Sequence, residues 1–588
     1  MKIIWTRRLC QGILLVLFFW FCWVAVWGDK YWQLRGWPVN LFLEMDPLAS
    51  LMTLLTTGML YKGLLLGWVV LGLTVLLGRF FCGWICPLGT LQQVFGWLGS
   101  CLKSRREKIE SNKYRGFQII KYYILVVLIV VALLPFEGFR LLLSGIFDPI
   151  SLVHRSVYFS FGYWADVTQI SNSVTPRLYS QAGVIALLFF GILITCWWLP
   201  RFYCRFICPA GALMGLFSRY AIWRIGKKEP ECSSCQLCNN HCEGACDPFG
   251  KIHIHDCLLC MNCLDACNQK SMGYQTKLSA SGEITNPDLT RRGLLISMAS
   301  GALLIPAIHI DGAFKQNWNA NLIRPPGTLP ENEFLKRCIR CGQCMKICPP
   351  NIIMPDGFIN GPESLWTPIL NFRIGTSGCQ INCVACSHIC PTGAIRPLTL
   401  DEKNGSGRYQ DKGPIRIGTA FVDKGRCLPW SMGRPCLVCQ ENCPISPKAI
   451  KTVDYYQMLP DYSGQVFQIN GNEIKFKGSI IQPASLNTGD YYLKTRNGTR
   501  YRISDNTDFT ITLESAGGKE RGIAIKNGDA FDIEILLHAP MVDVNLCVGC
   551  GTCEHECPVS GLRAIRVTAD NETRNDKHSF SVRRKTNG

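Results

Sequence analysis

Blocks of closely spaced cysteines are the feature of this 588-residue chain that most restricts its fold. Most of its 33 cysteines fall into blocks that follow, or nearly follow, the pattern Cys-x2-Cys-x2-Cys-x3-Cys. In bacterial ferredoxins three thiolates of such a block bind one [4Fe–4S] cluster, and the fourth cysteine binds the cluster of a neighbouring block. Zinc is the alternative metal, but its usual ligand spacing lacks this rhythm. The cysteines therefore predict a set of iron–sulfur domains.

Two blocks lie close together in the first half of the chain. Their cysteines are Cys232, Cys235, Cys238 and Cys242, followed by Cys257, Cys260, Cys263 and Cys267. Exchange of the fourth ligands predicts one cluster on Cys232, Cys235, Cys238 and Cys267, and another on Cys257, Cys260, Cys263 and Cys242. Because the proline that often follows the last cysteine is absent from both blocks, Cys246 is an alternative to Cys242.

Four further blocks occupy the second half of the chain, and each ends in Cys-Pro. They contain Cys338, Cys341, Cys344 and Cys348; Cys379, Cys383, Cys386 and Cys390; Cys427, Cys436, Cys439 and Cys443; and Cys547, Cys550, Cys553 and Cys557. They predict four clusters in two dicluster domains, so the whole chain would hold about six [4Fe–4S] clusters. The spacing leaves open whether the first of these blocks pairs with the second or with the fourth.

The segment at about 455–540, between the last two blocks, has a different character. Asn-Gly stands between alternating stretches at Val466 to Gly478, Tyr491 to Ile503 and Gly522 to Ile535. This is a strong β-hairpin signal. We predict a small antiparallel β insertion, which either shields the clusters or docks a partner.

Long apolar runs predict a membrane domain. Four spans are expected, at Gly12 to Trp27, Gly58 to Leu77, Ile119 to Leu134 and Val184 to Trp198. No small-residue cleavage site follows the first run, which favours an uncleaved span over a signal peptide. Basic residues concentrate before the first span, between the second and third, and after the fourth, so the N-terminus is predicted to be cytoplasmic.

The membrane domain contains an internal repeat. Cys82 and Cys86 form a Cys-x3-Cys-Pro motif after the second span, and Cys204 and Cys208 form the same motif after the fourth. A pseudo-two-fold bundle would bring these four cysteines together. Four thiolates are enough for one further iron–sulfur centre. Redox-active thiols and a purely structural role are the alternatives.

Ionisable residues lie near the opposite ends of these spans. Asp46 and Asp148 precede prolines in the repeated segments "MDPLASL" and "FDPISLV", and His154 follows the second of them. Ionisable groups at membrane depth are often functional, so these three are candidate proton-binding residues. Helix N-capping is the alternative for the two Asp-Pro pairs.

A twin arginine separates the two halves of the chain. Arg291 and Arg292 precede a moderately apolar run that ends at Ile308 and resembles a twin-arginine export signal. We predict that this run is a fifth span and that the residues after it are exported. A buried helix is the alternative, because the run is short and contains Pro306.

Several function classes are disfavoured. The formal net charge of +18 accompanies no basic stripe interleaved with aromatic residues, so no nucleic-acid partner is expected. Cys-x2-Cys-His is absent, so no covalent haem is expected, and no NAD or flavin motif is found. The chain can pass electrons, whereas its catalytic residues, apart from the three candidates Asp46, Asp148 and His154, are unknown.

The predicted fold is an α-helical membrane bundle of four spans plus a fifth, with bacterial-type α+β dicluster ferredoxin domains and a small antiparallel β insertion. The expected domains are a membrane domain at 1–225, a cytoplasmic ferredoxin domain at 226–280, the fifth span at 288–312 and a four-cluster domain at 325–588. The expected location is the inner membrane, with the C-terminal domain in the periplasm.

The motifs resemble a known family. Both Cys-x3-Cys-Pro motifs and the two following ferredoxin blocks are similar to the four-span polyferredoxin quinol dehydrogenase subunit of periplasmic nitrate reductase systems, and to the related membrane regulator of nitrous oxide reductase. From Thr290 onward, the twin arginine, the opening "CIRCGQCMKICP" and the four-block order resemble the exported four-cluster partner of that system. The chain thus looks like a fusion of the two subunits, with the β insertion as the main departure.

The resemblance implies a relay that takes electrons from membrane quinol and delivers them to a periplasmic acceptor, such as a c-type cytochrome or a reductase of the nitrate reductase type. With quinol as the donor, Asp46, Asp148 and His154 become the candidate quinone contacts. The alternative is a redox-dependent regulator or maturation factor for a periplasmic metalloenzyme, such as nitrous oxide reductase or an oxidase. The same motifs would serve either function. The two functions differ in the rate of electron transfer that each needs.

Overall fold

The computed structural model describes the chain except residues 1–2, 27–36, 135–141, 168–178, 180, 229–231, 233–234, 309–318, 359, 515–523 and 576–588. Trp27, 309–312 and 522–523, which belong to the predictions above, lie outside the described residues. The chain divides into two units. Unit 1 comprises Met1–Thr376, Asn382–Ile417 and Arg574–Asp576, and unit 2 comprises Ser377–Ile381, Gly418–Thr573 and Lys577–Gly588.

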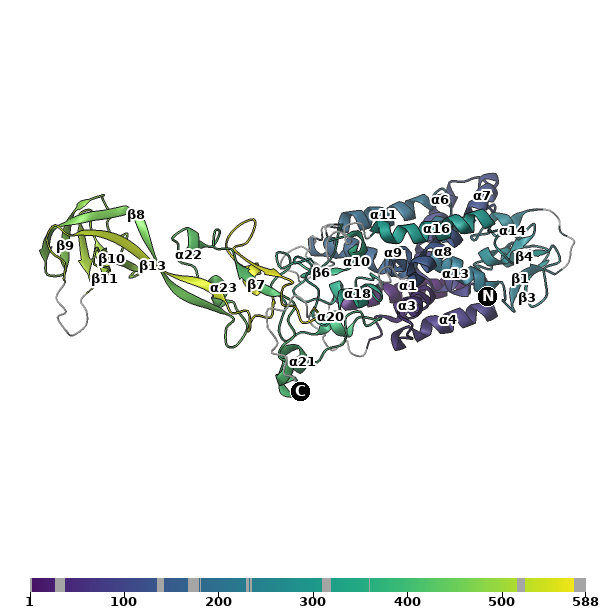
Figure 1. Cartoon of the computed structure of the whole chain (residues 1–588). Helices are drawn as coiled ribbons and strands as arrows, with labels where there is room; N and C mark the ends of the chain where they lie inside the picture. The colour runs from purple at the N-terminus through teal and green to yellow at the C-terminus, as the bar shows by residue number, and fades with distance from the viewer. Residues whose placement is uncertain are drawn as a thin grey trace, which may run out of the picture. The chain divides into compact units, whose positions relative to one another are not determined.

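A helical bundle forms the centre of unit 1 (Figure 1). Its helices are α1 (Ile3–Val26), α3 (Pro47–Thr57), α4 (Leu65–Leu77), α6 (Pro87–Cys101), α8 (Ile120–Leu133), α10 (Pro149–Val167), α11 (Ala182–Thr195), α13 (Pro209–Ser218) and α16 (Arg291–Ile308). Shorter helices between them are α2 (Leu41–Glu44), α5 (Phe80–Trp84), α7 (Arg105–Ser111), α9 (Ser144–Phe147) and α12 (Phe202–Phe206).

Two of the described helical stretches, Ile3–Ala25 and Arg105–Leu133, are long and apolar enough to cross a membrane. They correspond to the first and third predicted spans. The helices at the second and fourth predicted spans, Lys62–Leu77 and Ala182–Thr195, are shorter. Both nevertheless expose large apolar side chains, since Val69 is 56% and Leu187 is 73% exposed.

The sequence repeat is also a structural repeat. In each copy an Asp-Pro pair starts a helix: Asp46 caps α3 by accepting hydrogen bonds from the backbone N–H groups of Leu48 and Ala49, and Asp148 accepts one from Ser151. In each copy, too, a five-residue helix is followed by a new helix whose first residue is the proline of Cys-x3-Cys-Pro. The N-capping role predicted for both aspartates is confirmed, because proline at N1 and an acceptor before it favour a helix start.

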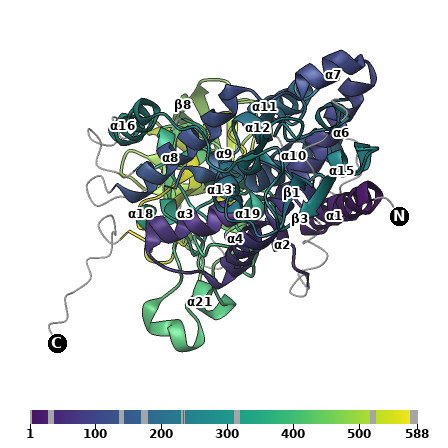
Figure 2. The ribbon, with the colours of Figure 1, turned by 90° about the vertical axis from the view of Figure 1, so that its right-hand side faces the viewer.

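Helix α16, which carries the twin arginine at its start, packs against α8 (Figure 2). An added Cβ at Gly293 would meet the Tyr123 hydroxyl at 2.4 Å, and one at Gly301 would meet Val130 at 2.9 Å. The partners advance in the same direction along both helices. Glycine at these two positions therefore allows α16 to lie directly against α8.

Two small ferredoxin-like regions of unit 1 contact opposite ends of the bundle (Figure 1). The first contains β1 (Arg224–Lys227), α14 (Leu237–Asn240), β2 (Ile252–His253), α15 (Asn262–Ala266), β3 (Met272–Gln275) and β4 (Glu283–Ile284). The second contains α18 (Glu331–Leu335), α19 (Gln343–Lys346), β5 (Ile353–Pro355), β6 (Pro368–Leu370), α20 (Ala385–His388) and α21 (Leu400–Asn404). Lys121, at the start of α8, pairs with Asp256 of the first region, whereas Leu142, beyond the end of α8, bonds to Leu335 of the second.

Unit 2 contains a third ferredoxin-like region and a barrel. The former has β7 (Thr419–Val422) paired antiparallel with β14 (Ile565–Thr568), together with α22 (Leu428–Ser431), α23 (Val438–Glu441) and α24 (Thr552–Glu556). The predicted β segment is a closed barrel in the order β10-β11-β12-β9-β8-β13. Its strands are β8 (Ile450–Asn470), β9 (Glu473–Gly478), β10 (Tyr491–Thr495), β11 (Arg500–Asn506), β12 (Thr510–Leu513) and β13 (Ala530–Val542).

The first two Asn-Gly pairs form the predicted hairpins, between β8 and β9 and between β10 and β11. The third prediction was wrong, because residues 524–526 form no strand and β13 pairs with β8 and β10 instead. Alternate residues such as Leu493, Ile503 and Ile533 point into the barrel and are fully buried. The strand pattern alone does not reveal which partner each strand takes, since every barrel strand alternates in the same way.

Candidate iron–sulfur sites

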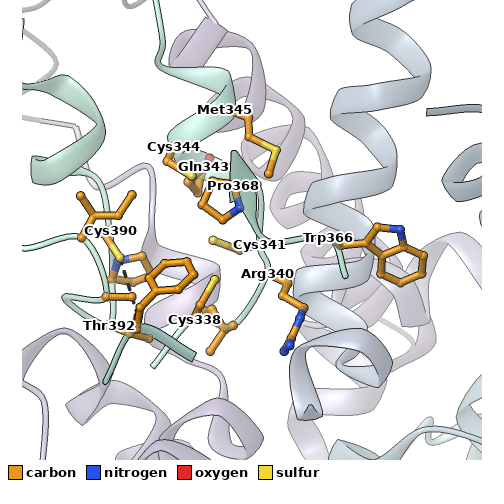
Figure 3. A pocket seen from close by; sticks show the side chains of 16 residues that line it. Cys338, Arg340, Cys341, Gln343, Cys344, Met345, Trp366, Pro368, Cys390 and Thr392 are labelled. Carbon is orange, nitrogen blue, oxygen red and sulfur yellow. Dashed lines mark hydrogen bonds between the residues drawn. The ribbon is translucent and has the colours of Figure 1, made fainter. Parts of the chain in front are cut away.

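Four cysteines of the second ferredoxin-like region line one pocket (Figure 3). They are Cys338, Cys341, Cys344 and Cys390, which we call set A. Three belong to the first of the four C-terminal blocks and the last is the Cys-Pro cysteine of the second. Block one therefore pairs with block two, which the sequence left open, and the fourth ligand is exchanged as in bacterial ferredoxins.

Unit 2 shows the same exchange between the third and fourth blocks. Cys427, Cys436, Cys439 and Cys557 (set B) line one pocket, and Cys443, Cys547, Cys550 and Cys553 (set C) line another. Of the remaining cysteines of blocks one and two, Cys348, Cys383 and Cys386 belong to unit 1 and Cys379 to unit 2. Their ligation by the same exchange rule follows from the sequence pattern alone. That grouping stays a prediction.

The backbone around these cysteines is shaped for a bound group. In three blocks the residues on either side of the second cysteine have positive φ: Leu259 and Met261, Arg340 and Gly342, and Gly549 and Gly551. Such a conformation costs a residue with a side chain roughly 1–2 kcal/mol. In two of these blocks non-glycine residues adopt the positive φ in spite of its cost. The turn that directs three thiols toward one centre is therefore needed for binding a group there.

The spacing of the cysteines, as in bacterial ferredoxins, favours a [4Fe–4S] cluster over a single ion. Among the described residues, no three Cys, His, Asp or Glu side chains converge as closely as one metal ion would need. Zinc holds its sulfur ligands at about 2.3 Å, which draws them close together. A [4Fe–4S] cluster binds each thiolate to a different iron and so spaces the four sulfurs more widely.

In the first ferredoxin-like region, two cysteines compete for one position. The Sγ atoms of Cys242 and Cys246 are 3.4 Å apart, and Cys246 also hydrogen-bonds Cys257. Both alternatives weighed from the sequence thus lie at the second predicted cluster. Cys238 interacts with Cys232 and Cys242, while the Cys267 thiol lies 3.6 Å from the Ser271 hydroxyl.

The four cysteines of the repeat converge inside the bundle. Cys82, Cys86, Cys204 and Cys208 are 3–8% exposed, and electrostatic interactions link Cys208 with the other three. The chain brings them together because each pair follows a helix of the same kind in the two halves of the repeat. This is the convergence expected from a pseudo-two-fold arrangement.

An arginine precedes each of these motifs and reaches across to the other. The Arg79 guanidinium lies against Gly211, where an added Cβ would approach it to 2.7 Å, and Arg201 lies against Gly89 at 3.3 Å. Arg201 also donates to the Cys82 carbonyl at 3.2 Å. The two glycines leave room for the opposite arginines, so positive charge surrounds the four thiols from both halves.

Glu243 joins the first ferredoxin-like region to the bundle. Its carboxylate accepts from Arg7 of α1 at 2.9 Å, from Arg201 at 3.0 Å and from Asn262 at 2.9 Å. Burial alone would raise the pKa of Glu243, but the two guanidinium groups outweigh it and hold that pKa at about 2. Asp256 has a similar role, since Lys121 and Arg79 lower its pKa in spite of burial.

The candidate quinone contacts are buried at the other end of the bundle. The carboxyl groups of Asp46 and Asp148 lie close enough to interact, and their Oδ2 and Oδ1 atoms, respectively, have no hydrogen-bond partner among the described residues. Two carboxyl groups so placed could share a hydrogen bond only if one of them carried a proton. His154 lies apart from this pair and contacts Lys346 Nζ at 3.2 Å through Nδ1, with Nε2 unpartnered among the described residues.

Comparisons with known proteins bear on these sites. A 4Fe-4S binding domain model matches residues 60–106 and 181–229, which include both Cys-x3-Cys-Pro motifs. A 4Fe-4S dicluster domain model matches 337–394, and a further 4Fe-4S binding domain model matches 540–563. The pairing of block one with block two agrees with the second match.

Three curated relatives share between a quarter and a third of their aligned residues with this chain. NapH, a ferredoxin-type protein of Escherichia coli, is 26% identical over 47% of this chain and 90% of its own length. The chain is a relative of ferredoxin-type electron-transport proteins. NirI of Paracoccus denitrificans is 26% identical over 39% of the chain, and the regulatory protein NosR of Stutzerimonas stutzeri is 27% identical over 33%. The resemblance inferred from the motifs is therefore confirmed.

The matches cover these relatives unequally. The chain spans only 32% of NirI and 24% of NosR. No solved structure matches the chain. Sequence reasoning found the cysteines but missed the charged residues around them, although the Arg-Phe pair at Arg79 and Arg201, three residues before each first cysteine, was a readable signal.

Proposed function

We propose that this protein is a membrane-bound iron–sulfur relay that carries electrons from membrane quinol to a periplasmic respiratory acceptor of the nitrate reductase type. The supporting observation is that two ferredoxin-like regions contact opposite ends of one helical bundle, with four buried thiols inside the bundle. When bound, [4Fe–4S] clusters would accept and release single electrons. The chain itself supplies the thiolates, the turns that aim them and the buried cations around them.

The bundle spans the inner membrane four times in this proposal, with α16 as a fifth span. The short helices at the second and fourth spans expose apolar side chains, as lipid-facing helices do. Since α16 runs parallel to α8, both would cross from the cytoplasmic side, and the residues after α16 would be periplasmic. In intact spheroplasts, protease should therefore cut after Pro326, while the region of Cys232 to Cys267 should stay protected. Protection of the residues after Pro326 would contradict this topology.

Cys82, Cys86, Cys204 and Cys208 would hold one further iron–sulfur centre in this relay. They come from two homologous segments, they are buried, and three cations, Arg79, Arg201 and Lys121, lie close enough to act on Cys204. Cations around thiolates offset the negative charge that four of them bring. The centre would thus provide an electron step within the bundle.

The Asp46–Asp148 pair would accept protons when quinol is oxidised. Quinol oxidation releases two protons with two electrons, and a buried carboxyl pair holding one proton has room for another. Asp148 would accept a proton from the quinol, and Asp46 would hold the proton that the pair already shares. His154 is an additional candidate that lies closer to set A. Asparagine at either position would preserve the shape of the side chain and remove the proton site.

The experiment is anaerobic reduction of the purified protein by a menaquinol analogue, with EPR counting of the reduced centres. We expect several centres to be reduced, and we expect Asp148→Asn to slow their reduction at least tenfold with unchanged iron content. Ser151→Ala, which leaves the carboxyl pair in place, is the control. If no centre fills although dithionite fills them all, quinol is not the donor; a normal rate in Asp148→Asn would remove the pair from the proposal.

A regulator or maturation factor is the second candidate function, because one matched relative is named a regulatory protein. Such a factor would use the same clusters to supply electrons for assembling a periplasmic metalloenzyme. Rate separates the two functions. A respiratory relay should turn over with quinol at respiratory speed, of order 10 per second or faster, whereas an assembly factor needs only slow delivery.

A further inference from the structure

Three buried cations surround set A without a carboxylate partner. Arg340 lies between Cys338 and Cys341, is 1% exposed, and donates to the carbonyl oxygens of Leu365 at 2.8 Å and Glu363 at 2.9 Å. Its backbone carbonyl accepts a hydrogen bond from Arg155, which is fully buried.

Arg155 and Lys346 complete the group. The Arg155 guanidinium also stacks on Trp366 at 4.2 Å, which lines the pocket of set A. Lys346, 2% exposed, donates to the His154 ring at 3.2 Å and to the Cys22 thiol at 3.5 Å. Among the described residues, no carboxylate lies within ion-pair distance of any of the three, whereas Arg324 nearby is paired with Glu331.

A buried cation without a counter-charge is costly, so these three need negative charge close by. The four thiolates of set A with a bound [4Fe–4S] cluster would supply it, at roughly −2 when oxidised and −3 when reduced. Three cations stabilise the reduced cluster, which is the more negative, more strongly than the oxidised cluster. They therefore raise the reduction potential of that cluster, since net charge is one of the quantities that set it.

The other sites differ in their balance of charge. At the opposite end of the bundle, Glu243 and Asp256 pair with four cations, whereas Arg205, 3% exposed beside Cys242, has no carboxylate partner among the described residues. In the described part of unit 2 no lysine or arginine is buried, and Glu554, next to Cys553 of set C, is only 6% exposed. Negative charge beside a cluster lowers its potential.

We propose that Arg155, Arg340 and Lys346 raise the reduction potential of the cluster on set A above the potentials of the clusters on sets B and C. This inference rests on the proposed cluster binding. A quinol is a mild reductant, and a raised potential is what lets one of its two electrons reduce a ferredoxin-type cluster. Lys346 touches His154, a candidate quinone contact, so the cluster on set A is the first acceptor for electrons that enter at this end.

The test is an anaerobic redox titration of the full chain followed by EPR. Compared with the signal that vanishes in Cys550→Ser, which alters set C, the signal that vanishes in Cys341→Ser should titrate at a higher potential. Arg155→Gln and Lys346→Gln should each shift the equilibrium of that signal at least tenfold toward the oxidised form, which is about 59 mV for one electron. Arg155→Lys keeps the positive charge, so its reduction potential should lie close to that of the unmodified chain.

Iron content separates this inference from the proposed function. If the purified chain binds no clusters, the proposed function fails as well. If clusters are bound but the signal lost in Cys341→Ser titrates no higher than the signal lost in Cys550→Ser, or both glutamine variants load fully and titrate like the unmodified chain, the inference alone is overturned. Arg106→Gln, an exposed charge at the other end of the bundle, should leave every potential unchanged.

Discussion

Replacing Glu243 with glutamine should lower the free energy of unfolding of the first ferredoxin-like region by about 3–5 kcal/mol. The substitution leaves the buried guanidinium groups of Arg7 and Arg201 without their counter-charge. An unpaired buried charge costs far more than the same charge in a pair. The pKa of about 2 held by Glu243 reflects how strongly both arginines stabilise its ionised form.

The effect should extend beyond one domain. Arg7 lies in the first helix and Arg201 precedes the second Cys-x3-Cys-Pro motif, so Glu243 links three segments that are far apart in the sequence. We expect Glu243→Gln to release the ferredoxin-like region from the bundle at lower denaturant concentration. Bleaching of the cluster absorbance during denaturant titration in detergent would measure it.

A matched control is Glu333→Gln. Glu333 also pairs with two cations, Lys336 and Arg337, but its side chain is 42% exposed. Surface ion pairs contribute roughly 0–1 kcal/mol, so this variant should unfold nearly as the unmodified chain does. Equal losses in the two variants would show that burial of the Glu243 pair contributes nothing.

Most of the predicted cluster ligands could be read from the cysteine pattern. Spacing within a block is local, so the ligand exchange that joins Cys390 to Cys338, Cys341 and Cys344 followed from the ferredoxin rule once the partner block was known. The choice of partner block was not predictable, because it depends on how loops of different length pack. The capping by Asp46 and Asp148 was predictable for the same local reason.

The charged surroundings of the sites were not predictable. Arg7 and Glu243 are separated by 236 positions, and nothing in either local sequence indicates the other. The number of spans is also underdetermined, since Lys62–Leu77 and Ala182–Thr195 are shorter than a bilayer needs unless flanking residues contribute. Hydropathy reports composition along the chain, whereas burial of Arg155 or Lys346 depends on the packed structure.

Replacing Cys82 and Cys204 with serine together should remove about four iron and four sulfide ions per chain, the content of one [4Fe–4S] cluster. One ligand is lost from each half of the repeat, and two remaining thiolates do not hold such a cluster. Serine is close in size to cysteine, so helix packing should change little. Iron and acid-labile sulfide in anaerobically purified protein measure the effect.

The matched control is Cys196→Ser, because Cys196 is also fully buried in the bundle but bonds to Gln92 and the Ile192 carbonyl instead. Its iron content should equal that of the unmodified chain. An unchanged count in the double variant would mean that the repeat holds thiols and no centre; quantification of thiols in the unmodified chain before and after reduction would then show whether Cys82 and Cys204 form reversible disulfides. A loss of four irons together with loss of quinol-dependent reduction of the clusters in the first ferredoxin-like region would instead place the centre in the electron path, since the thiols of that region are untouched by either substitution.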